Sequence, residues 1–166
     1  MKKEDSLQLA TLDECEFVLT QLPDLTAPGF DNYYADRHEC KTARRAREGL
    51  LPQVRRSPTP ITDPEVRWEI SIARQFIRYF GRPRKTIYRK RGSYGLKHEA
   101  EQYMGAYISN GAFIAAACLE GYAIERGGPN ACFSLSLAPE YWRLRSARRS
   151  AIWPKLRACG WLYCVS

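Results

Sequence analysis

The most concentrated chemical signal in this chain is a run of cations at residues 82–92, RPRKTIYRKRG. No acidic residue interrupts it. Lys and Arg side chains bind phosphates, and a tyrosine ring among them offers a surface for base stacking. The run predicts contact with a nucleic-acid backbone, whereas the alternative is a solvated charged loop. The residues concerned are Arg82, Arg84, Lys85, Tyr88, Arg89, Lys90 and Arg91.

Residues suited to catalysis or metal binding do not form a recognisable set. His98 and Glu99 begin like a zinc-peptidase helix, but that motif needs a second histidine at position 102, which is Gln. His38 has no further ligands at usable spacing. The sequence also lacks a phosphate-binding loop, a dinucleotide fingerprint and a nucleophile elbow. We therefore expect no metal, no cofactor and no enzymatic activity.

Composition limits the kind of protein and the kind of partner. The 166 residues are 45% hydrophobic and 12% aromatic, which is sufficient for one packed domain with at most a small appendage. The formal net charge is +8, which suits a polyanion such as nucleic acid or an acidic protein face. The alternative is a basic surface that serves solubility alone.

Cysteine spacing and the N-terminal residues bear on localisation. The six cysteines form no C-x-x-C pair, and the opening MKKEDSLQLA has no apolar core of a secretory signal. The longest apolar run, residues 112–119, is too short to cross a bilayer. We expect six reduced thiols in a cytoplasmic protein that does not enter a membrane.

The first third of the chain is predicted to be helical. Thr11 to Glu14 is a capping-box pattern, which opens a helix that continues to about Gln21. Residues 31–50 are a second helical candidate, with one arginine-rich side. Four prolines in residues 52–64 then mark a linker. We assign residues 1–51 to an N-terminal helical segment and 52–62 to the linker.

Residues 63–137 contain the best-defined pattern. A helix begins at Asp63 and Pro64 and stops at Gly81, and a short strand is expected at residues 86–88. Ser93 and then Ser109 with Asn110 cap two further helices, and a hairpin turns at residues 127–130. The apolar face of the helix after Ser93 is expected to contain Tyr94, Leu96, Ala100, Tyr103 and Met104.

Residues 138–166 are predicted to form a basic helix and a packed tail. Pro139 and Glu140 begin the helix, and Pro154 is expected to interrupt it. Arg145, Arg148 and Arg149 fall on its outer side and join the predicted phosphate contacts, as does Lys97. The fold class is mainly α with a small β-hairpin (α+β), in which N- and C-terminal helices flank the central unit.

The order of elements in residues 63–137 resembles that of winged helix-turn-helix domains. The resemblance implies that the helix after Ser109 enters the DNA major groove and that the hairpin, or wing, touches the DNA backbone or minor groove. Only Ser109, Asn110 and Tyr107 would then reach bases, because residues 113–119 are almost wholly apolar. That apolar run favours a core helix with a polar N-terminus, so backbone contact is better supported than base reading.

Two functional hypotheses follow. The first is a small nucleic-acid-binding accessory or regulatory protein that contacts phosphates through its Arg and Lys clusters, with DNA favoured over RNA. The second is a non-enzymatic, protein-binding inhibitor, such as a phage- or plasmid-encoded inhibitor of a host defence complex. Its basis is the apolar would-be recognition helix together with the many tyrosines and arginines, which are enriched at protein interfaces.

Overall fold

The computed structural model describes residues 8–30 and 59–158, with side chains described through Arg148. The fold is mainly α-helical with small antiparallel sheets, as predicted. The helices are α1 (Leu12–Gln21), α3 (Pro64–Phe80), α4 (Ser93–Met104), α5 (Asn110–Leu119) and α6 (Pro139–Ala158). The strands are β1 (Leu25–Thr26), β2 (Gly29–Phe30), β3 (Gly81–Pro83), β4 (Ile124–Gly127), β5 (Asn130–Phe133) and β6 (Leu135–Leu137).

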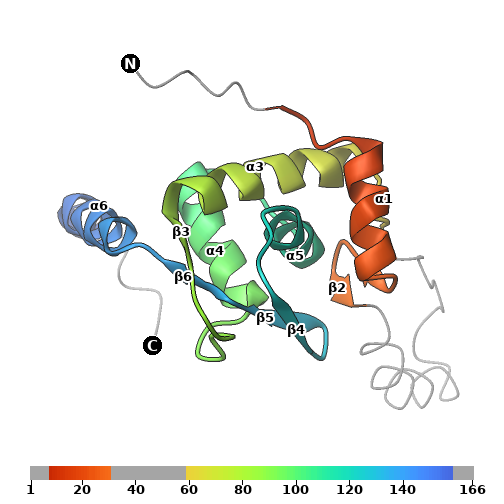
Figure 1. The fold of residues 1–166 in the computed structure, drawn as a ribbon. Helices are drawn as coiled ribbons and strands as arrows, with labels where there is room; N and C mark the ends of the chain where they lie inside the picture. Colours follow the sequence, from red (N-terminus) through yellow and green to blue (C-terminus); the bar gives the residue numbers. More distant parts are fainter. Residues whose placement is uncertain (1–7, 31–58, 159–166) are drawn as a thin grey trace, which may run out of the picture.

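Helix α5 lies at the centre of the molecule. Its sequence, NGAFIAAACL, offers almost no polar side chain to solvent, and residues 110–117 are all buried. Figure 1 shows α5 below α3, with α1 on one side and α4 on the other. Helix α3 has a strongly amphipathic sequence, and its buried face includes Ile70, Phe76 and Ile77. Burial of apolar side chains from both helices therefore forms the centre of the core.

Residues 8–30 belong to the same core. Thr11 and Glu14 form the predicted capping box of α1, which directs Cys15 and Val18 inward. The short β1–β2 hairpin then approaches the beginning of α5, where the Gly111 amide donates to the Ala27 carbonyl at 2.7 Å. The last residues of the proline-rich range also pack here, because Ala27 donates to Thr59 and Ile61 is fully buried.

The short strand expected at residues 86–88 is not observed there, so this prediction was wrong. The strand is instead β3, which follows α3 directly and pairs antiparallel with β6, with Arg82 opposite Ser136. Burial gives the reason. Gly81 is buried beside the apolar strand β6, whereas residues 84–86 are exposed and form only isolated backbone hydrogen bonds. The position of the strand depends on this long-range pairing, which local β propensity does not report.

Two helix boundaries also differ from the predictions. Gly92, rather than Ser93, precedes α4, and the buried Ser93 hydroxyl accepts a hydrogen bond from the Ala131 amide at 3.1 Å. Helix α6 continues to Ala158, so Pro154 does not interrupt it. Ser109 caps α5 as expected. The predicted helix at residues 31–50 and the tail after residue 158 lie outside the described residues.

Close packing at Gly111 gives the first prediction. A methyl group there would overlap the Thr26 carbonyl oxygen, whereas one at Gly95 in α4 would meet nothing within 4 Å. Gly111→Ala should therefore lower the free energy of unfolding by roughly 1–3 kcal/mol, as overpacking does. The control Gly95→Ala should raise it by roughly 0.5–1 kcal/mol, because alanine favours a helix interior. Urea unfolding followed by circular dichroism measures both, and equal stability of the two variants would contradict the packing described here.

Candidate nucleic-acid interface

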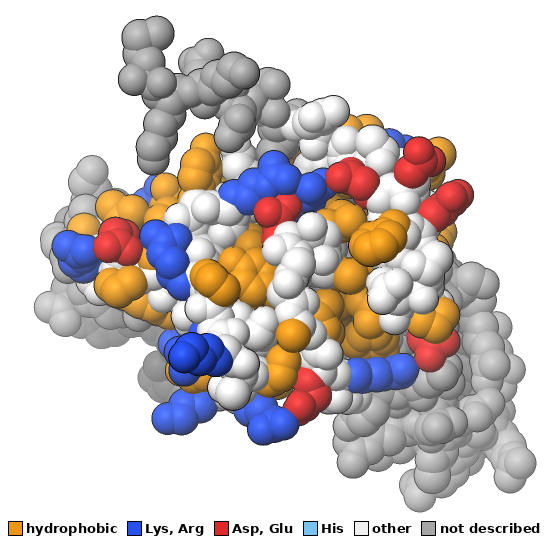
Figure 2. Space-filling view, viewed as in Figure 1, with side chains coloured by type: hydrophobic (Ala, Val, Ile, Leu, Met, Phe, Trp, Pro, Cys, Tyr) orange, Lys and Arg blue, Asp and Glu red, His pale blue; other side chains and the backbone are white. Residues whose placement is uncertain are grey.

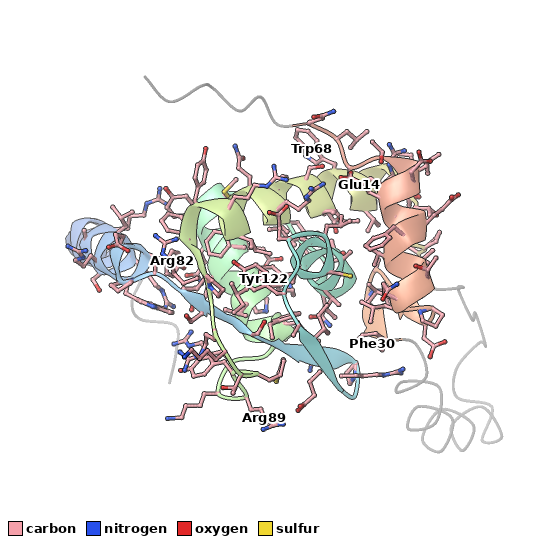
Figure 3. The ribbon with its side chains drawn as sticks, viewed as in Figure 1. Glu14, Phe30, Trp68, Arg82, Arg89 and Tyr122 are labelled. Carbon is pink, nitrogen blue, oxygen red and sulfur yellow. The ribbon has the colours of Figure 1, made fainter. Side chains whose placement is uncertain are left out.

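Backbone hydrogen bonds hold the cationic run, residues 82–91, hereafter the basic loop, against the strands. The Arg84 amide donates to Ser134 and the Tyr88 amide donates to Phe133, each at 2.8 Å. Gly92 then forms a bridge with Cys132. The loop thus follows the edge of β5 and β6, and Figure 3 shows Arg89 at the lower margin of the molecule. Its side chains are carried by a backbone that is fixed at several points.

Four cations of the basic loop are exposed and have no acidic partner within the described part of the chain: Arg82, Arg84, Lys85 and Lys90. The Arg84 guanidinium lies over the Tyr88 ring, 4.7 Å from its centroid. Figure 2 shows Lys and Arg side chains gathered at the lower left, where Figure 1 shows the loop between β3 and α4. This group is a ready source of positive charge for phosphates.

Arg89 is also exposed, but a carboxylate already neutralises it. Its Nε and Nη2 donate to the two oxygens of Glu125 on β4, each at 2.7 Å. This bidentate pair lowers the pKa of the Glu125 carboxyl, because the hydrogen bonds and the positive charge favour its ionised form. The predicted phosphate contact at Arg89 would have to compete with Glu125.

Arg91 and Arg145 converge on one buried carboxylate. Oε1 of Glu99 forms an ion pair with Arg145 Nη1 at 2.9 Å and accepts a hydrogen bond from Arg91 Nη1 at 3.3 Å. Tyr141 donates its hydroxyl to Oε2 at 2.6 Å, and burial, followed by this contact with Glu99, raises the Tyr141 pKa. Both guanidiniums lie over the Trp142 ring. This cluster joins α4, the basic loop and α6, so its two arginines are largely committed to the fold.

Of the other predicted arginines on α6, Arg148 is exposed. It donates to the Tyr103 carbonyl at 3.3 Å, and its guanidinium lies 4.6 Å from the centroid of the Tyr103 ring. No acidic partner for it occurs among the described residues. The side chain of Arg149 lies outside the described residues.

Three residues of the predicted nucleic-acid contact are buried and already bonded to other groups of the protein. Lys97 is 5% exposed and forms an ion pair with Glu101 at 3.0 Å. Ser109 caps α5, and Asn110 donates to the Pro129 carbonyl at 3.0 Å. The hairpin tip is also engaged, because the Pro129 oxygen accepts from the Phe30 amide. Residues 26–30 therefore cover the surface that the resemblance assigns to DNA, and we remove these three side chains from the candidate interface.

A second group of side chains surrounds Glu101 near the end of α4. Its Oε1 accepts from Lys97 and from the Ile108 amide, and its Oε2 lies 2.6 Å from Nδ1 of His98. Tyr107 in the following turn is 69% exposed, whereas Tyr94, predicted to face the core, is 56% exposed. Helical spacing placed Tyr94 on the apolar face of α4, because an aromatic side chain counts as apolar. Spacing alone therefore did not identify this side of α4 as exposed to solvent.

The described residues provide no group of three His, Cys, Asp or Glu side chains that could hold a metal ion. Their three cysteines, Cys15, Cys118 and Cys132, are unpaired, and none of their helices is long and apolar enough to span a membrane. No family model matches the chain, and no curated protein or solved structure matches it significantly.

The surroundings of Glu101 give the second prediction. Burial raises the carboxyl pKa, but the hydrogen bonds from Ile108, Lys97 and His98 outweigh burial, so the pKa lies below its ordinary value of 4.5. The ionised group therefore stabilises the fold above that value, and this contribution is lost as the pH falls through the folded-state pKa. Glu101→Gln should cost about 1–3 kcal/mol at pH 7 and weaken the pH dependence below about pH 4.5.

Urea unfolding of the parent and variant at a series of pH values measures this difference. Glu16→Gln on the exposed side of α1 is the control, and it should leave the acid-dependent loss of stability as it is in the parent. If Glu101→Gln and the parent lost stability in parallel below pH 4.5, the hydrogen bonds to Glu101 would not favour its ionised form.

Proposed function

We propose that this protein binds nucleic acid by contacting backbone phosphates through Arg82, Arg84, Lys85 and Lys90. The observation that carries the proposal is that these cations are exposed, lack acidic partners within the described residues and share one loop. A phosphate contact replaces condensed counterions around the nucleic acid, and their release supplies most of the binding free energy of such a surface.

The anchored backbone supports the same proposal. Hydrogen bonds from Arg84 and Tyr88 to the strands fix the loop before any partner arrives. Less conformational entropy is lost on binding when the contacting segment is already ordered. Arg148 adds a further exposed cation from α6. An accessory or regulatory role suits such a surface, which positions the protein on nucleic acid without reading bases in a groove.

The burial of α5 argues against base reading by that helix. A recognition helix must present polar side chains to base edges, and α5 has none exposed. The proposed contact is therefore largely independent of sequence. The resemblance in element order to winged helix-turn-helix domains favours DNA over RNA as the partner.

A protein-binding inhibitor is the second candidate. It is favoured by large apolar side chains on the side of α1 and α3, where Phe17 is 54% exposed and Trp68 is 48% exposed. Aromatic residues of this kind are frequent hot spots of protein interfaces. Salt separates the two candidates, because phosphate binding weakens steeply as salt rises, whereas a desolvated protein interface depends on salt only weakly.

Removal of the unpaired lysines gives the third prediction. Lys85→Ala combined with Lys90→Ala should weaken binding to all probes and reduce the slope of log K against log salt by about 2, one for each lost phosphate contact. Fluorescence anisotropy with labelled duplex DNA, single-stranded DNA and RNA measures this between about 50 and 200 mM salt. No binding of the folded parent protein to any probe would refute nucleic-acid binding.

Arg78→Ala is the matched control for each single lysine variant. Arg78 is an exposed arginine near the end of α3 and outside the basic loop, and Arg74 also pairs with its partner Glu120. Its loss removes one charge from the whole protein, as each lysine variant does. Equal weakening by Arg78→Ala and Lys90→Ala would show that net charge, rather than the basic loop, governs binding.

The pair between Arg89 and Glu125 gives the fourth prediction. Glu125→Gln removes the negative charge that holds the Arg89 guanidinium, and both side chains are exposed. The freed cation adds a phosphate contact, so affinity should rise and the salt slope should steepen by about 1. The same anisotropy titration tests it. Unchanged affinity would place Arg89 outside the interface, and the combined change with Arg89→Ala should abolish the gain.

A further inference from the structure

A shallow, open hollow lies where α4 meets the turn before α5. Its volume is about 460 Å³, and its walls include His98, Gln102, Ala106 and Tyr107. The wall is mainly apolar, and the His98 ring and the Gln102 amide add polar atoms to it. Its shape and chemistry suit a flat, partly polar ligand.

One exposed tyrosine ring, Tyr107, lines the hollow, and a second, Tyr94, packs against His98 in its wall. The buried Lys97 ammonium lies 5.3 Å from the centroid of the Tyr94 ring and 5.3 Å from that of Tyr107. The His98 ring is nearly perpendicular to Tyr94, with centroids 4.5 Å apart. These contacts restrict the rings, yet the two tyrosines are 56% and 69% exposed. Held rings with exposed faces are the elements of a base-stacking platform.

The charges beneath the rings are already balanced. Glu101 pairs with Lys97 and contacts His98, so the hollow carries no strong charge of its own for a phosphate. Gln102, exposed at its wall, retains an amide for hydrogen bonding. With Nδ1 facing Glu101, the other ring nitrogen of His98 is also left for a ligand. These groups match the edges of a nucleobase better than they match a phosphate.

We propose that this hollow binds an unpaired base of single-stranded nucleic acid, with Tyr107 and Tyr94 as stacking surfaces, while the basic loop holds the adjoining phosphates. The proposal rests on the proposed function. Tyr94 links the two regions, because it follows Lys90 by only four residues and its ring contacts His98 in the wall of the hollow. A neutral aromatic hollow beside a cationic loop complements a strand that alternates flat bases with negative phosphates.

The test compares single-stranded and duplex oligonucleotides of equal length at fixed salt. A base within a duplex is not free to leave its stack without cost, so the parent should bind the single strand more tightly. Tyr107→Ala should weaken single-strand binding about 5- to 100-fold, the loss expected for one stacked base. The salt slope should remain at the parent value, because stacking releases no counterions.

Two variants control for effects on the fold and on aromatic surface in general. Tyr107→Phe keeps the ring and should retain most of the affinity, whereas Tyr79→Ala removes a ring that is 54% exposed on α3 and should change nothing. Thermal unfolding confirms that each variant is folded. The effects of Tyr107→Ala and the lysine variants should add, since the two sites act on different parts of the strand.

The possible outcomes distinguish the base site from the proposed phosphate binding on which it rests. No binding to any probe overturns both. Binding that weakens with Lys85→Ala and Lys90→Ala, but not with Tyr107→Ala, supports the phosphate surface and overturns the base site. Equal affinity for single strand and duplex also overturns it. A Tyr107→Ala effect that appears with an acidic protein partner, but with no oligonucleotide, would assign the hollow to a protein interface instead.

Discussion

The burial of α5 over residues 110–117 is the constraint on which the rest of this structure depends. A helix that reads NGAFIAAACL has no extended polar face, so other elements must cover it on all sides. Helix α3 covers one side, α1 and the β1–β2 hairpin another, and α4 and β5 the remainder. Because Gly111 has no side chain, the Thr26 carbonyl can lie directly against it. Residues 8–30 are thus part of the core rather than appended to it.

The same constraint determines which of the predicted site residues are exposed. The covering of the α5 N-terminus by residues 26–30 uses Ser109, Asn110 and the hairpin tip for internal hydrogen bonds. The helix that the resemblance predicts to enter a DNA groove is therefore buried here. The exposed cations and aromatic rings lie instead on the basic loop and on the outer side of α4. These surfaces do not take part in burying α5.

The sequence predicted what local interactions decide and missed what distant partners decide. The α1 capping box, the Asp63 and Pro64 start of α3 and the Ser109 cap were all predicted, because each depends on residues within one turn. The position of β3 was not, because it depends on β6, more than fifty residues later. The sequence also failed to predict which cations pair with acidic residues, for the same reason. Glu125 is 36 residues from Arg89, and nothing near Arg89 in the sequence indicates its partner.

Charge compensation decides which of the predicted cations remain without an acidic partner among the described residues. A count of Lys and Arg treats all members of the run alike, yet Glu125 engages Arg89 and the buried Glu99 engages both Arg91 and Arg145. A buried carboxylate must keep its partners, because the loss of one leaves an uncompensated charge in a poorly solvated site. The exposed lysines neutralise no buried carboxylate. Arg82, Arg84, Lys85 and Lys90 form no ion pair among the described residues, so their substitution should cost the fold little stability. Because none of them contacts the Glu99 cluster, the charge of the basic loop can change without disturbing the buried carboxylate.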